Sequence, residues 1–470
     1  MKKLPVIAIF DAGKTNKKLF LFDEQYKIVF ERTWQFDETT DDDGDPCENI
    51  DTLTSAVEDG LSQVLSDDEF DVKAINFTSY GASFVHLDQD RKPVTPIYNY
   101  LKPYPQDIHQ KFYSTYGGEE KFSLETASPV LGSLNSGMQL YRIKYEKPRL
   151  YDRIHSSLHL PQFLSSLVSG KQVSEITSIG CHTNLWNYHK NSYHEWVVKE
   201  GINEKLPAIV RSDSVFSEEF FSKKVKTGIG LHDSSAALIP YLATVEEPFI
   251  LLSTGTWCIS MNPFNDSPLT ASELQQDCLC YLTYEGKPVK ASRLFAGNEH
   301  EIQTKKLAAH FHVDSMYYKT VSFSEKLIQD ILEITPQNES LRSNDPSLLS
   351  RFNKRDLTIY KSYELAYHQL MLDIMRSQVA STRLVASKGV STIFVDGGFS
   401  KNQIYMNLLA TAFPENKVYA ASVPEATAMG AALAIHTHWN RQPVSKSLIQ
   451  LQAYRPDTNI HITEVLYQTF

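Results

Sequence analysis

Residues 6–15 read Val-Ile-Ala-Ile-Phe-Asp-Ala-Gly-Lys-Thr, an unbroken apolar run followed by small and polar residues. The run at 6–10 predicts a buried strand, because a strand with one solvated face would alternate apolar and polar side chains. A second apolar run follows at 19–22, and 27–31 predicts a third strand. The chain is therefore expected to open with a strand, a tight polar turn and a returning strand.

The same pattern returns near the middle of the chain. Residues 249–252 read Phe-Ile-Leu-Leu, Ser-Thr-Gly-Thr forms a turn at 253–256, and 257–261 is expected to return as a strand. A third strand-to-turn signal covers 393–400, and 403–413 is predicted to be helical. Strand-like and helix-like segments alternate in both halves, which predicts α/β layers.

Two hairpins half a chain apart predict two similar α/β domains. We expect a boundary near Pro248, with an N-terminal domain over 1–246 and a C-terminal domain over 247–470. The length of 470 residues suits two or three domains. A hydrophobic content of 42% allows a substantial core and excludes disorder as the main state.

Charge and cysteine content narrow the class of protein further. A net charge of −10 argues against a general nucleic-acid binder. Five cysteines in so long a chain do not make a disulfide scaffold, which favours a cytoplasmic enzyme. No stretch approaches the roughly 20 apolar residues of a membrane span, and the run at 6–10 is too short for a signal peptide.

The first turn carries groups that suit a phosphate. Backbone N–H groups and the hydroxyl of Thr15 follow the strand end, and Gly13 lets the backbone approach a ligand because it has no Cβ. Asp11 could hold Mg²⁺ directly or through water. An ordinary hairpin turn is the alternative, since Asp and Gly are common in turns. The turn at 253–256 offers the same groups at the mirrored place, and the pair of turns favours the phosphate interpretation.

The segment at 228–238 has both a structural and a catalytic interpretation. Two glycines precede His232 and Asp233, and a helix-like run follows. Asp233 is either a helix N-cap or a general base in a cleft between the domains.

The segment at 396–402 also has two interpretations. Gly397 and Gly398 would let a flat ligand lie against bare backbone, whereas the alternative is a plain turn in which Ser400 or Asn402 caps the next helix.

Taken in order, these segments resemble the FGGY family of carbohydrate kinases, which belongs to the fold group of actin, hexokinase and the heat-shock 70 chaperones. The resemblance covers nearly the whole chain. It rests on a first phosphate motif at 11–15 with Lys18 and Asp23 beyond it, a catalytic segment at 232–236, a second phosphate motif at 253–256, an adenosine motif at 396–398 with Asn402, and a connecting helix at 425–431.

The resemblance implies an α/β fold of two similar ribonuclease H-like domains, of the actin and hexokinase type, with a central interdomain cleft. It implies a kinase that uses ATP and Mg²⁺, with Asp233 as the general base and Asp11 as the metal-binding residue. The implied nucleotide- and phosphate-binding residues are Gly13, Lys14, Thr15, Thr254, Gly255, Thr256, Gly397, Gly398 and Asn402. The implied sugar-binding residues are Gly81, Asn135, Gln139, His232 and Asp233. Asn135 and Gln139 also fit the polar start of a helix, and that alternative stays open.

The sequence departs from the family pattern in two places. Lys14 stands where family members often have Thr or Ser. Many members carry a sugar-binding carboxylate in a stretch that here reads Ile-Tyr-Asn-Tyr-Leu-Lys at 97–102, so that carboxylate is missing. The segment His-Asp-Ser-Ser-Ala at 232–236 is most similar to the pattern of rhamnulose and fuculose kinases. The resemblance thus implies a 6-deoxy ketohexose, such as L-rhamnulose or L-fuculose, as the substrate.

A deoxy sugar would need apolar surface for its methyl group. Tyr80, Phe84, Tyr98 and Tyr100 are the candidates, with an ordinary aromatic core as the alternative. Other functions remain open: a pentulose kinase of the xylulose or ribulose type, a non-catalytic sugar-binding protein on the same fold, and, more distantly, a glycerol or acetate kinase. The expected partners are a small sugar and ATP, with no nucleic acid and no membrane, and a homodimer is compatible with the sequence.

Two polar segments are predicted to lie on the surface. The acidic stretch at 37–45 is expected to be a solvated loop, and His189 and His194 are expected to be exposed. Cys278 and Cys280 are interpreted as structural rather than metal-binding, because no second closely spaced cysteine pair accompanies them.

Overall fold

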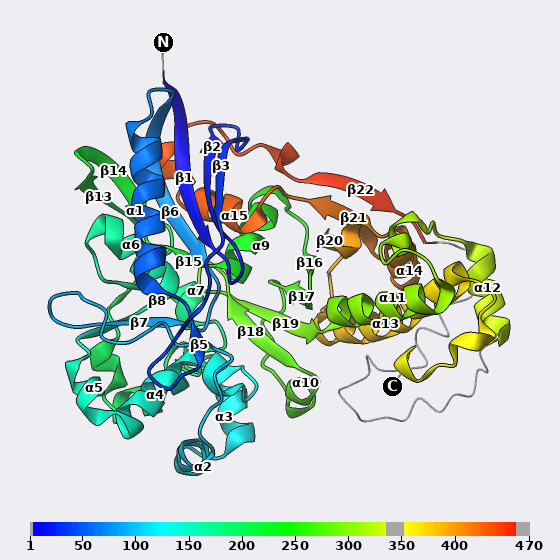
Figure 1. Ribbon diagram of the computed structural model, residues 1–470, viewed down its shortest axis with the longest axis horizontal. Helices are drawn as coiled ribbons and strands as arrows, with labels where there is room; N and C mark the ends of the chain where they lie inside the picture. Colours follow the sequence, from blue (N-terminus) through cyan, green and yellow to red (C-terminus); the bar gives the residue numbers. More distant parts are fainter. Residues whose placement is uncertain (1–2, 335–351, 457–470) are drawn as a thin grey trace.

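The structure, a computed structural model, describes residues 3–334 and 352–456 and contains two large mixed sheets (Figure 1). The first sheet contains, in spatial order, β13 (Val215–Phe220), β14 (Lys223–Gly228), β6 (Phe70–Ser79), β1 (Leu4–Ala12), β2 (Lys17–Asp23) and β3 (Ile28–Trp34), and β15 (Leu231–His232) also pairs with β6. The second contains β18 (Cys278–Leu282), β19 (Pro288–Leu294), β17 (Cys258–Asn262), β16 (Phe249–Thr254), β20 (Thr392–Gly397), β21 (Lys417–Ser422) and β22 (Gln450–Tyr454).

The two sheets share one arrangement of strands. In the first, β1 pairs antiparallel with β2 and β2 with β3, whereas β1 pairs parallel with β6. In the second, β16 pairs antiparallel with β17 and β17 with β19, whereas β16 pairs parallel with β20. A long helix precedes the parallel strand in each case: α1 (Ile50–Ser66) precedes β6, and α13 (Tyr363–Val385) precedes β20. The predicted repetition of one α/β arrangement is therefore confirmed.

The predicted strands lie where the apolar runs indicated, but their ends differ. β1 extends from Leu4 to Ala12 rather than over 6–10, because its pairing with β6 continues at both ends. Ile7 and Ile9 face one side of this strand and Phe10 the other, and none of the three is exposed to solvent. Burial on both faces explains why the strand reads as a continuous apolar run.

Helices α9 (Asp233–Thr244) and α15 (Ala426–Ala434) lie between the two sheets (Figure 1). A Cβ at Gly430 would lie 1.9 Å from the carbonyl oxygen of Ala236, which shows that the two helices approach each other closely. On the side of the first sheet, Asn76 of β6 donates from Nδ2 to the carbonyl oxygen of Ala431 at 2.8 Å. The small residues of the connecting helix at 425–431 allow this close packing.

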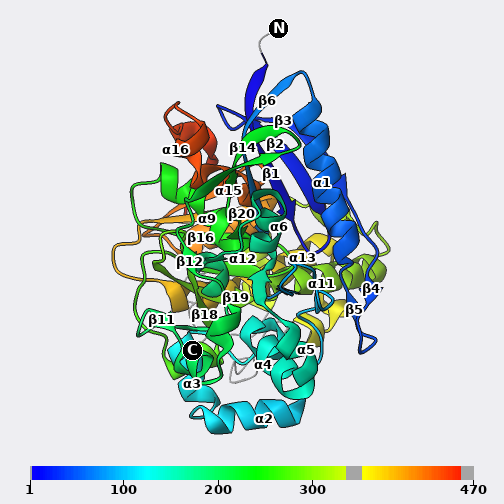
Figure 2. The same ribbon diagram turned by 90° about the vertical axis from the view of Figure 1, so that its left-hand side faces the viewer.

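A large extension of the N-terminal half lies between β6 and β13, and Figure 2 shows much of it gathered at the end of the molecule opposite the N-terminus. It contains β7 (Phe84–Leu87), α2 (Gln106–Thr115), α3 (Glu119–Thr126), α4 (Ser136–Glu146), α5 (Pro148–Arg153), β8 (Ser156–His159), α6 (Leu160–Ser169), α7 (Ile176–Ile179) and α8 (Glu195–Lys199). Its core is aromatic: the ring of Phe112 meets those of Tyr141 and Trp196 edge-on, at centroid distances of 4.8 and 5.1 Å.

The C-terminal half carries its own helices on the second sheet. They are α10 (Ala271–Gln275), α11 (Ala296–Phe311), α12 (Glu325–Ile334) and α14 (Gln403–Ala412), together with α13, whereas the short α16 (His436–Trp439) lies against β6 of the first sheet. Helix α14 corresponds to the helix predicted at 403–413. No helix in the described ranges combines the length and the apolarity needed to cross a membrane.

Two surface predictions are correct only in part: most of the acidic stretch at 37–45 is exposed, and so is His189. Asp41, in the acidic stretch, is buried because Lys102 forms an ion pair with it. His194 is also buried, since it caps the start of α8 and its Nε2 lies 3.0 Å from Glu125 Oε2. In both cases a partner from a distant part of the sequence compensates the buried polar group.

Candidate active site

The first candidate phosphate turn joins β1 to β2. A Cβ at Gly13 would lie 2.9 Å from the carbonyl oxygen of Asn16, so the tight turn favours glycine at this position. Thr15 at the tip is exposed. The turn therefore presents the tip hydroxyl to solvent, as a phosphate-binding turn requires.

Lys14 extends from this turn toward other segments of the N-terminal half. Its Nζ donates to Glu38 Oε1 at 2.9 Å and lies 5.9 Å from the ring centres of both Tyr80 and Tyr100. The ammonium group is thus close to two of the aromatic side chains that are candidates for contact with the methyl group of the sugar.

Asp11 lies at the end of β1, where the two halves of the molecule meet. Its Oδ2 accepts a hydrogen bond of 2.5 Å from Thr427 Oγ1 on α15. Burial raises the pKa of Asp11 to about 7; the Thr427 hydrogen bond and the Lys18 ammonium oppose this, while the charges of Asp233 and Glu425 add to it. The carboxylates of Asp233 and Glu425 both contribute to raising the pKa of Asp11, so the site has excess negative charge and hard oxygen ligands, which fits Mg²⁺.

Asp233 is the first residue of α9, and the N-cap interpretation of this residue is wrong. The cap position belongs to His232, whose side chain makes no capping hydrogen bond. Asp233 Oδ1 accepts hydrogen bonds from the backbone N–H of Ser234 at 2.6 Å and from its hydroxyl at 3.3 Å. Burial raises the pKa of Asp233 to about 6, although the two Ser234 hydrogen bonds lower it. A carboxylate poised near neutrality suits general base catalysis.

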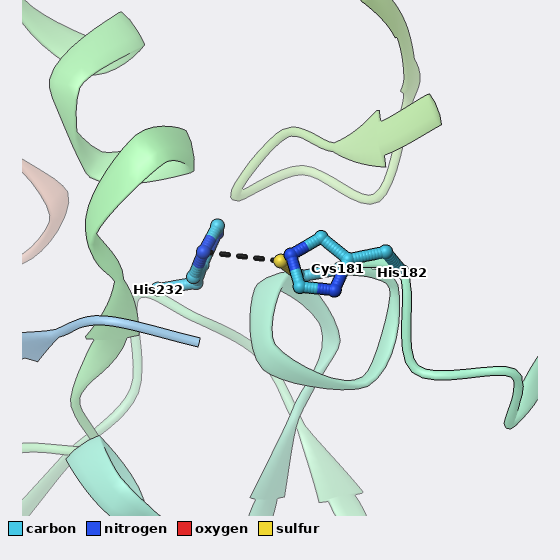
Figure 3. Close-up of side chains that lie close together, drawn as sticks. All are labelled: Cys181, His182 and His232. Atoms are coloured by element: carbon cyan, nitrogen blue, oxygen red, sulfur yellow. Dashed lines mark hydrogen bonds between the residues drawn. The ribbon is translucent and has the colours of Figure 1, made fainter. Parts of the chain in front are cut away.

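His232 and Gly81 lie beside Asp233. The Nε2 atom of His232 is 3.3 Å from Asp233 Oδ1 and 3.0 Å from Cys181 Sγ (Figure 3). Burial lowers the pKa of His232 to about 3, so its ring is neutral. A Cβ at Gly81 would lie 2.9 Å from that ring and 3.1 Å from the sulfur. The fold therefore brings together three of the residues predicted to bind the sugar, and adds Cys181, which no sequence motif indicated.

Asn135 and Gln139 lie at the start of α4, where both have structural contacts. The Asn135 amide accepts from the backbone N–H of Leu131 at 2.7 Å and donates to the carbonyl oxygen of His182 at 2.8 Å. Gln139 donates from Nε2 to the carbonyl oxygen of Ala82 at 2.8 Å. These bonds hold the loops around Gly81, and a contact with sugar stays a prediction for both residues.

The four aromatic candidates separate into two groups. Tyr80 and Tyr100 pack against each other with ring centroids 5.9 Å apart, and the nearby charge of Asp233 contributes to raising the pKa of Tyr100. Phe84 instead stacks on a core histidine, and the Tyr98 hydroxyl donates to a carboxylate of the acidic stretch. Of the four, Tyr100 is thus connected to Asp233 by the interaction of their charges, and Tyr80 packs against Tyr100.

The second and third turns are tied together by Thr254. Its Oγ1 donates to the carbonyl oxygen of Asp396 at 2.5 Å and accepts from the backbone N–H of Phe399 at 3.0 Å. Gly397 has φ of 86°, and a Cβ there would lie 2.0 Å from the carbonyl oxygen of Thr254. The Thr254 side chain thus serves the contact between the turns, and the positive φ and close approach require glycine at 397.

A cavity of about 860 Å³ opens in the C-terminal half beside these turns. Four residues from the predicted nucleotide set line it: Gly255, Thr256, Gly398 and Asn402. Asn402 is also the N-cap of α14, since its Oδ1 accepts the N–H groups of two residues in the first turn. The structural and the ligand-binding interpretations of Asn402 are therefore compatible.

The opposite wall of the cavity was not predicted. It comes from α11 and the short 3₁₀ helix Tyr317–Thr320, through Gly297, His300, Thr304 and Tyr318. A Cβ at Gly297 would lie 1.9 Å from the carbonyl oxygen of Gly255, so α11 begins directly against the second turn. The sequence signal that could have indicated this contact is Gly297, a glycine in the first turn of a mostly polar helix.

Two family sequence profiles match the chain in succession. The one described as "FGGY family of carbohydrate kinases, N-terminal domain" matches residues 6–239, and "Carbohydrate kinase FGGY, C-terminal domain" matches 246–443. Together they cover most of the chain.

Curated relatives are distant in sequence. The chain is 23% identical over 259 residues to a rhamnulokinase of Halalkalibacterium halodurans, a match that covers 53% of this chain and only 54% of that protein. It is 22% identical over 413 residues to a rhamnulokinase of Oceanobacillus iheyensis, covering 82% of both.

A solved structure confirms the fold class. The ligand-bound xylulose kinase of Lactobacillus acidophilus superposes with a TM-score of 0.78 at 16% identity, covering 98% of this chain and 96% of that one. The predicted α/β architecture of two similar domains, of the actin and hexokinase type, is therefore correct.

Proposed function

The chain belongs to the FGGY family of carbohydrate kinases, and we propose that it transfers the γ-phosphoryl group of ATP to a hydroxyl of a 6-deoxy ketohexose such as L-rhamnulose or L-fuculose. The observation that carries the proposal is the position of Asp233. It is a half-buried carboxylate with a pKa of about 6, beside His232 and Gly81 and close enough to Asp11 for their charges to interact.

Asp233 acts as the general base. Its described hydrogen bonds and its contact with His232 all involve Oδ1, which leaves Oδ2 to accept the proton of the sugar hydroxyl. The deprotonated oxygen attacks the γ-phosphorus, the bond between that phosphorus and the bridging oxygen breaks, and ADP leaves. Phosphoryl transfer is mostly positioning and charge neutralisation, so the turns around Gly13 and Gly255 hold the phosphates.

Asp11 is the residue that would hold Mg²⁺, with its position fixed by the hydrogen bond from Thr427. The ion would supply neutralisation of the charge on the phosphate oxygens. The nucleotide base and ribose occupy the cavity lined by Gly398 and Asn402, on the same face as the Gly255 turn.

The substrate class rests on three observations. The catalytic segment 232–236 is most similar to the pattern of rhamnulose and fuculose kinases, and the two curated relatives are named rhamnulokinase. Tyr100, which packs against Tyr80, is near enough to Asp233 for their charges to interact, and its ring offers aromatic surface on which a methyl group would gain about 0.8 kcal/mol on burial. One methyl group gives a preference of only about 10- to 200-fold over a sugar that lacks it.

Two alternative functions would use parts of the same structure. A pentulose kinase would use the same base and the same turns with a different sugar pocket. A non-catalytic sugar-binding protein would need none of Asp11, Asp233 and the cavity, and the presence of all three in one arrangement argues against it.

The test is ADP release from ATP and Mg²⁺ with a panel of ketoses, aldoses and glycerol. We expect the highest kcat/KM with L-rhamnulose or L-fuculose. A clear preference for D-xylulose or L-ribulose would overturn the substrate class and leave the kinase assignment standing. No sugar-dependent ADP release across the panel would overturn the kinase assignment.

We also propose a cytoplasmic location and a homodimer. The five cysteines are free and buried, which suits a reducing compartment. Cell fractionation tests the location, and light scattering during size-exclusion chromatography tests the assembly.

A further inference from the structure

Cys181, His182 and His232 form a compact cluster of potential metal ligands beside the proposed base. Cys181 and His182 follow α7, and His232 closes β15, so the fold joins segments about fifty residues apart (Figure 3). The sulfur and one nitrogen of each imidazole all lie within 4.8 Å of one another. Cys181 and His232 are buried, whereas His182 is half-buried.

The distances suit a tetrahedral ion after small movements. With bonds of about 2.3 Å to sulfur and 2.0–2.1 Å to nitrogen, a tetrahedral Zn²⁺ holds its ligand atoms about 3.5 Å apart. The Cys181 Sγ to His232 Nε2 distance is 3.0 Å, and the remaining separations do not exceed 4.8 Å. Movements of the ligand atoms by roughly 1 Å would therefore bring them to three of the four tetrahedral positions around the ion. The fourth position would be left for water.

The surroundings of His182 are those of a metal-binding histidine. Its Nδ1 lies 3.2 Å from the carbonyl oxygen of Leu134, and Figure 3 shows a ring nitrogen directed toward the sulfur. A hydrogen bond from one ring nitrogen to a backbone carbonyl fixes the tautomer that leaves the other nitrogen free to bind a metal. His182 also has φ of 37°, a strained backbone value of the kind that occurs at functional sites.

The ligand set selects among cations. One thiolate and two imidazoles suit a borderline-soft ion such as Zn²⁺, whereas Mg²⁺ requires hard oxygen ligands and near-octahedral geometry. The Mg²⁺ that ATP brings therefore does not compete for this cluster.

We propose that Cys181, His182 and His232 bind a zinc-class divalent cation, and that the bound cation inhibits the kinase. The inhibition rests on the proposed function: Asp233 Oδ1 lies 3.3 Å from His232 Nε2, so a dication on that nitrogen holds the base carboxylate and weakens it as a proton acceptor. The cluster is thus an inhibitory site, separate from the magnesium site at Asp11.

Metal binding is tested on the reduced full-length protein, with Mg²⁺ in excess, by titration with Co²⁺ followed by Zn²⁺. We expect one Co²⁺ per chain, with near-ultraviolet thiolate-to-cobalt absorption that Zn²⁺ abolishes. Cys181→Ser should remove this absorption, and His182→Gln should weaken binding about 100-fold or more, since even supporting partners of metal ligands are worth about 10- to 100-fold. Cys278→Ser, an equally buried cysteine outside the cluster, is the matched control and should bind as the wild type does.

Absence of the cobalt absorption in the wild type, or its persistence in Cys181→Ser, would overturn the proposal. Because Cys181→Ser changes a buried residue, the half-buried His182→Gln provides the second variant, and equal affinity in His182→Gln and wild type would also overturn it. Thermal unfolding of each variant verifies that it is folded.

Kinase assays test the inhibition separately. At fixed Mg²⁺ and ATP, Zn²⁺ should lower wild-type turnover at least tenfold, while His182→Gln keeps measurable turnover and needs about 100-fold more Zn²⁺. Equal sensitivity of the two enzymes would overturn the inhibitory role. Since the cobalt spectrum needs no sugar, failure of the kinase assignment and failure of the metal site give different results.

Discussion

Replacing Asp233 by asparagine isolates the proposed base. The amide keeps the shape of the side chain and an oxygen that can accept the 2.6 Å hydrogen bond from the N–H of Ser234, but it cannot accept a proton. At pH 7.5 a carboxyl with a pKa of about 6 is almost wholly ionised, so the wild-type base is available. Loss of a general base costs about 10²–10⁴ in kcat, or about 2.7–5.5 kcal/mol on the barrier.

The same variant should fold normally. Burial disfavours the ionised form of Asp233, and its charge contributes to the raised pKa of Asp11, so a neutral side chain removes a desolvation cost and a repulsion. The melting temperature should equal or exceed that of the wild type, and sugar and Mg·ATP should still bind.

The assay measures ADP release at pH 7.5 together with calorimetric binding of both substrates. Asp107→Asn, another aspartate in the first turn of a helix, is the matched control and should be fully active. Turnover of Asp233→Asn within tenfold of the wild type would refute the assignment, and a parallel loss of stability and sugar affinity would make the residue structural.

Four further substitutions test the surroundings of the base, the nucleotide site and the metal-binding residue. Ser234→Ala removes the 3.3 Å hydrogen bond that lowers the Asp233 pKa, so the acid limb of the pH profile of kcat/KM should move to higher pH; an unchanged or lowered midpoint would contradict this. Gly398 lines the cavity, so Gly398→Val should raise the KM for ATP. Stability should be unchanged, because φ at this position is −64° and the nearest neighbour of a Cβ is 3.8 Å away. Gly397→Ala should instead destabilise by about 2–4 kcal/mol in urea unfolding, since a Cβ would meet an oxygen at 2.0 Å; similar behaviour of the two glycine variants would count against this placement. Asp11→Asn should weaken Mg²⁺ dependence about 10- to 100-fold with little effect on sugar binding, and an equal loss of sugar affinity would mean a structural role.

The strands that support the site could be predicted because their residues are buried on both faces. Such strands read as continuous apolar runs, as at 6–10 and 249–252, and the polar turns at their ends stand out. The catalytic segment was visible for a similar reason, since Asp233 starts a helix directly after a short buried strand.

Contacts between distant segments could not be predicted in the same way. Cys181 meets His232 only because α7 lies against β15, and a single sequence carries no signal of that neighbourhood. From the sequence alone Asp41 is expected to be solvated, and only its ion pair with the distant Lys102 explains why it is buried. The cavity wall on α11 was missed because its lining residues form no motif and depend on the helix starting against Gly255.

The position of α15 has a consequence for how the protein is made. This helix packs on α9 and the first sheet, with Asn76 bonded to Ala431 and Asp11 to Thr427, yet it follows α9 in the chain by about 180 residues. At the roughly 5–20 residues per second of synthesis, the ribosome needs about 10–40 s to cover that interval. Throughout that time the nascent N-terminal half lacks one of its own packing layers, so it cannot complete its core before the C-terminal half has been translated.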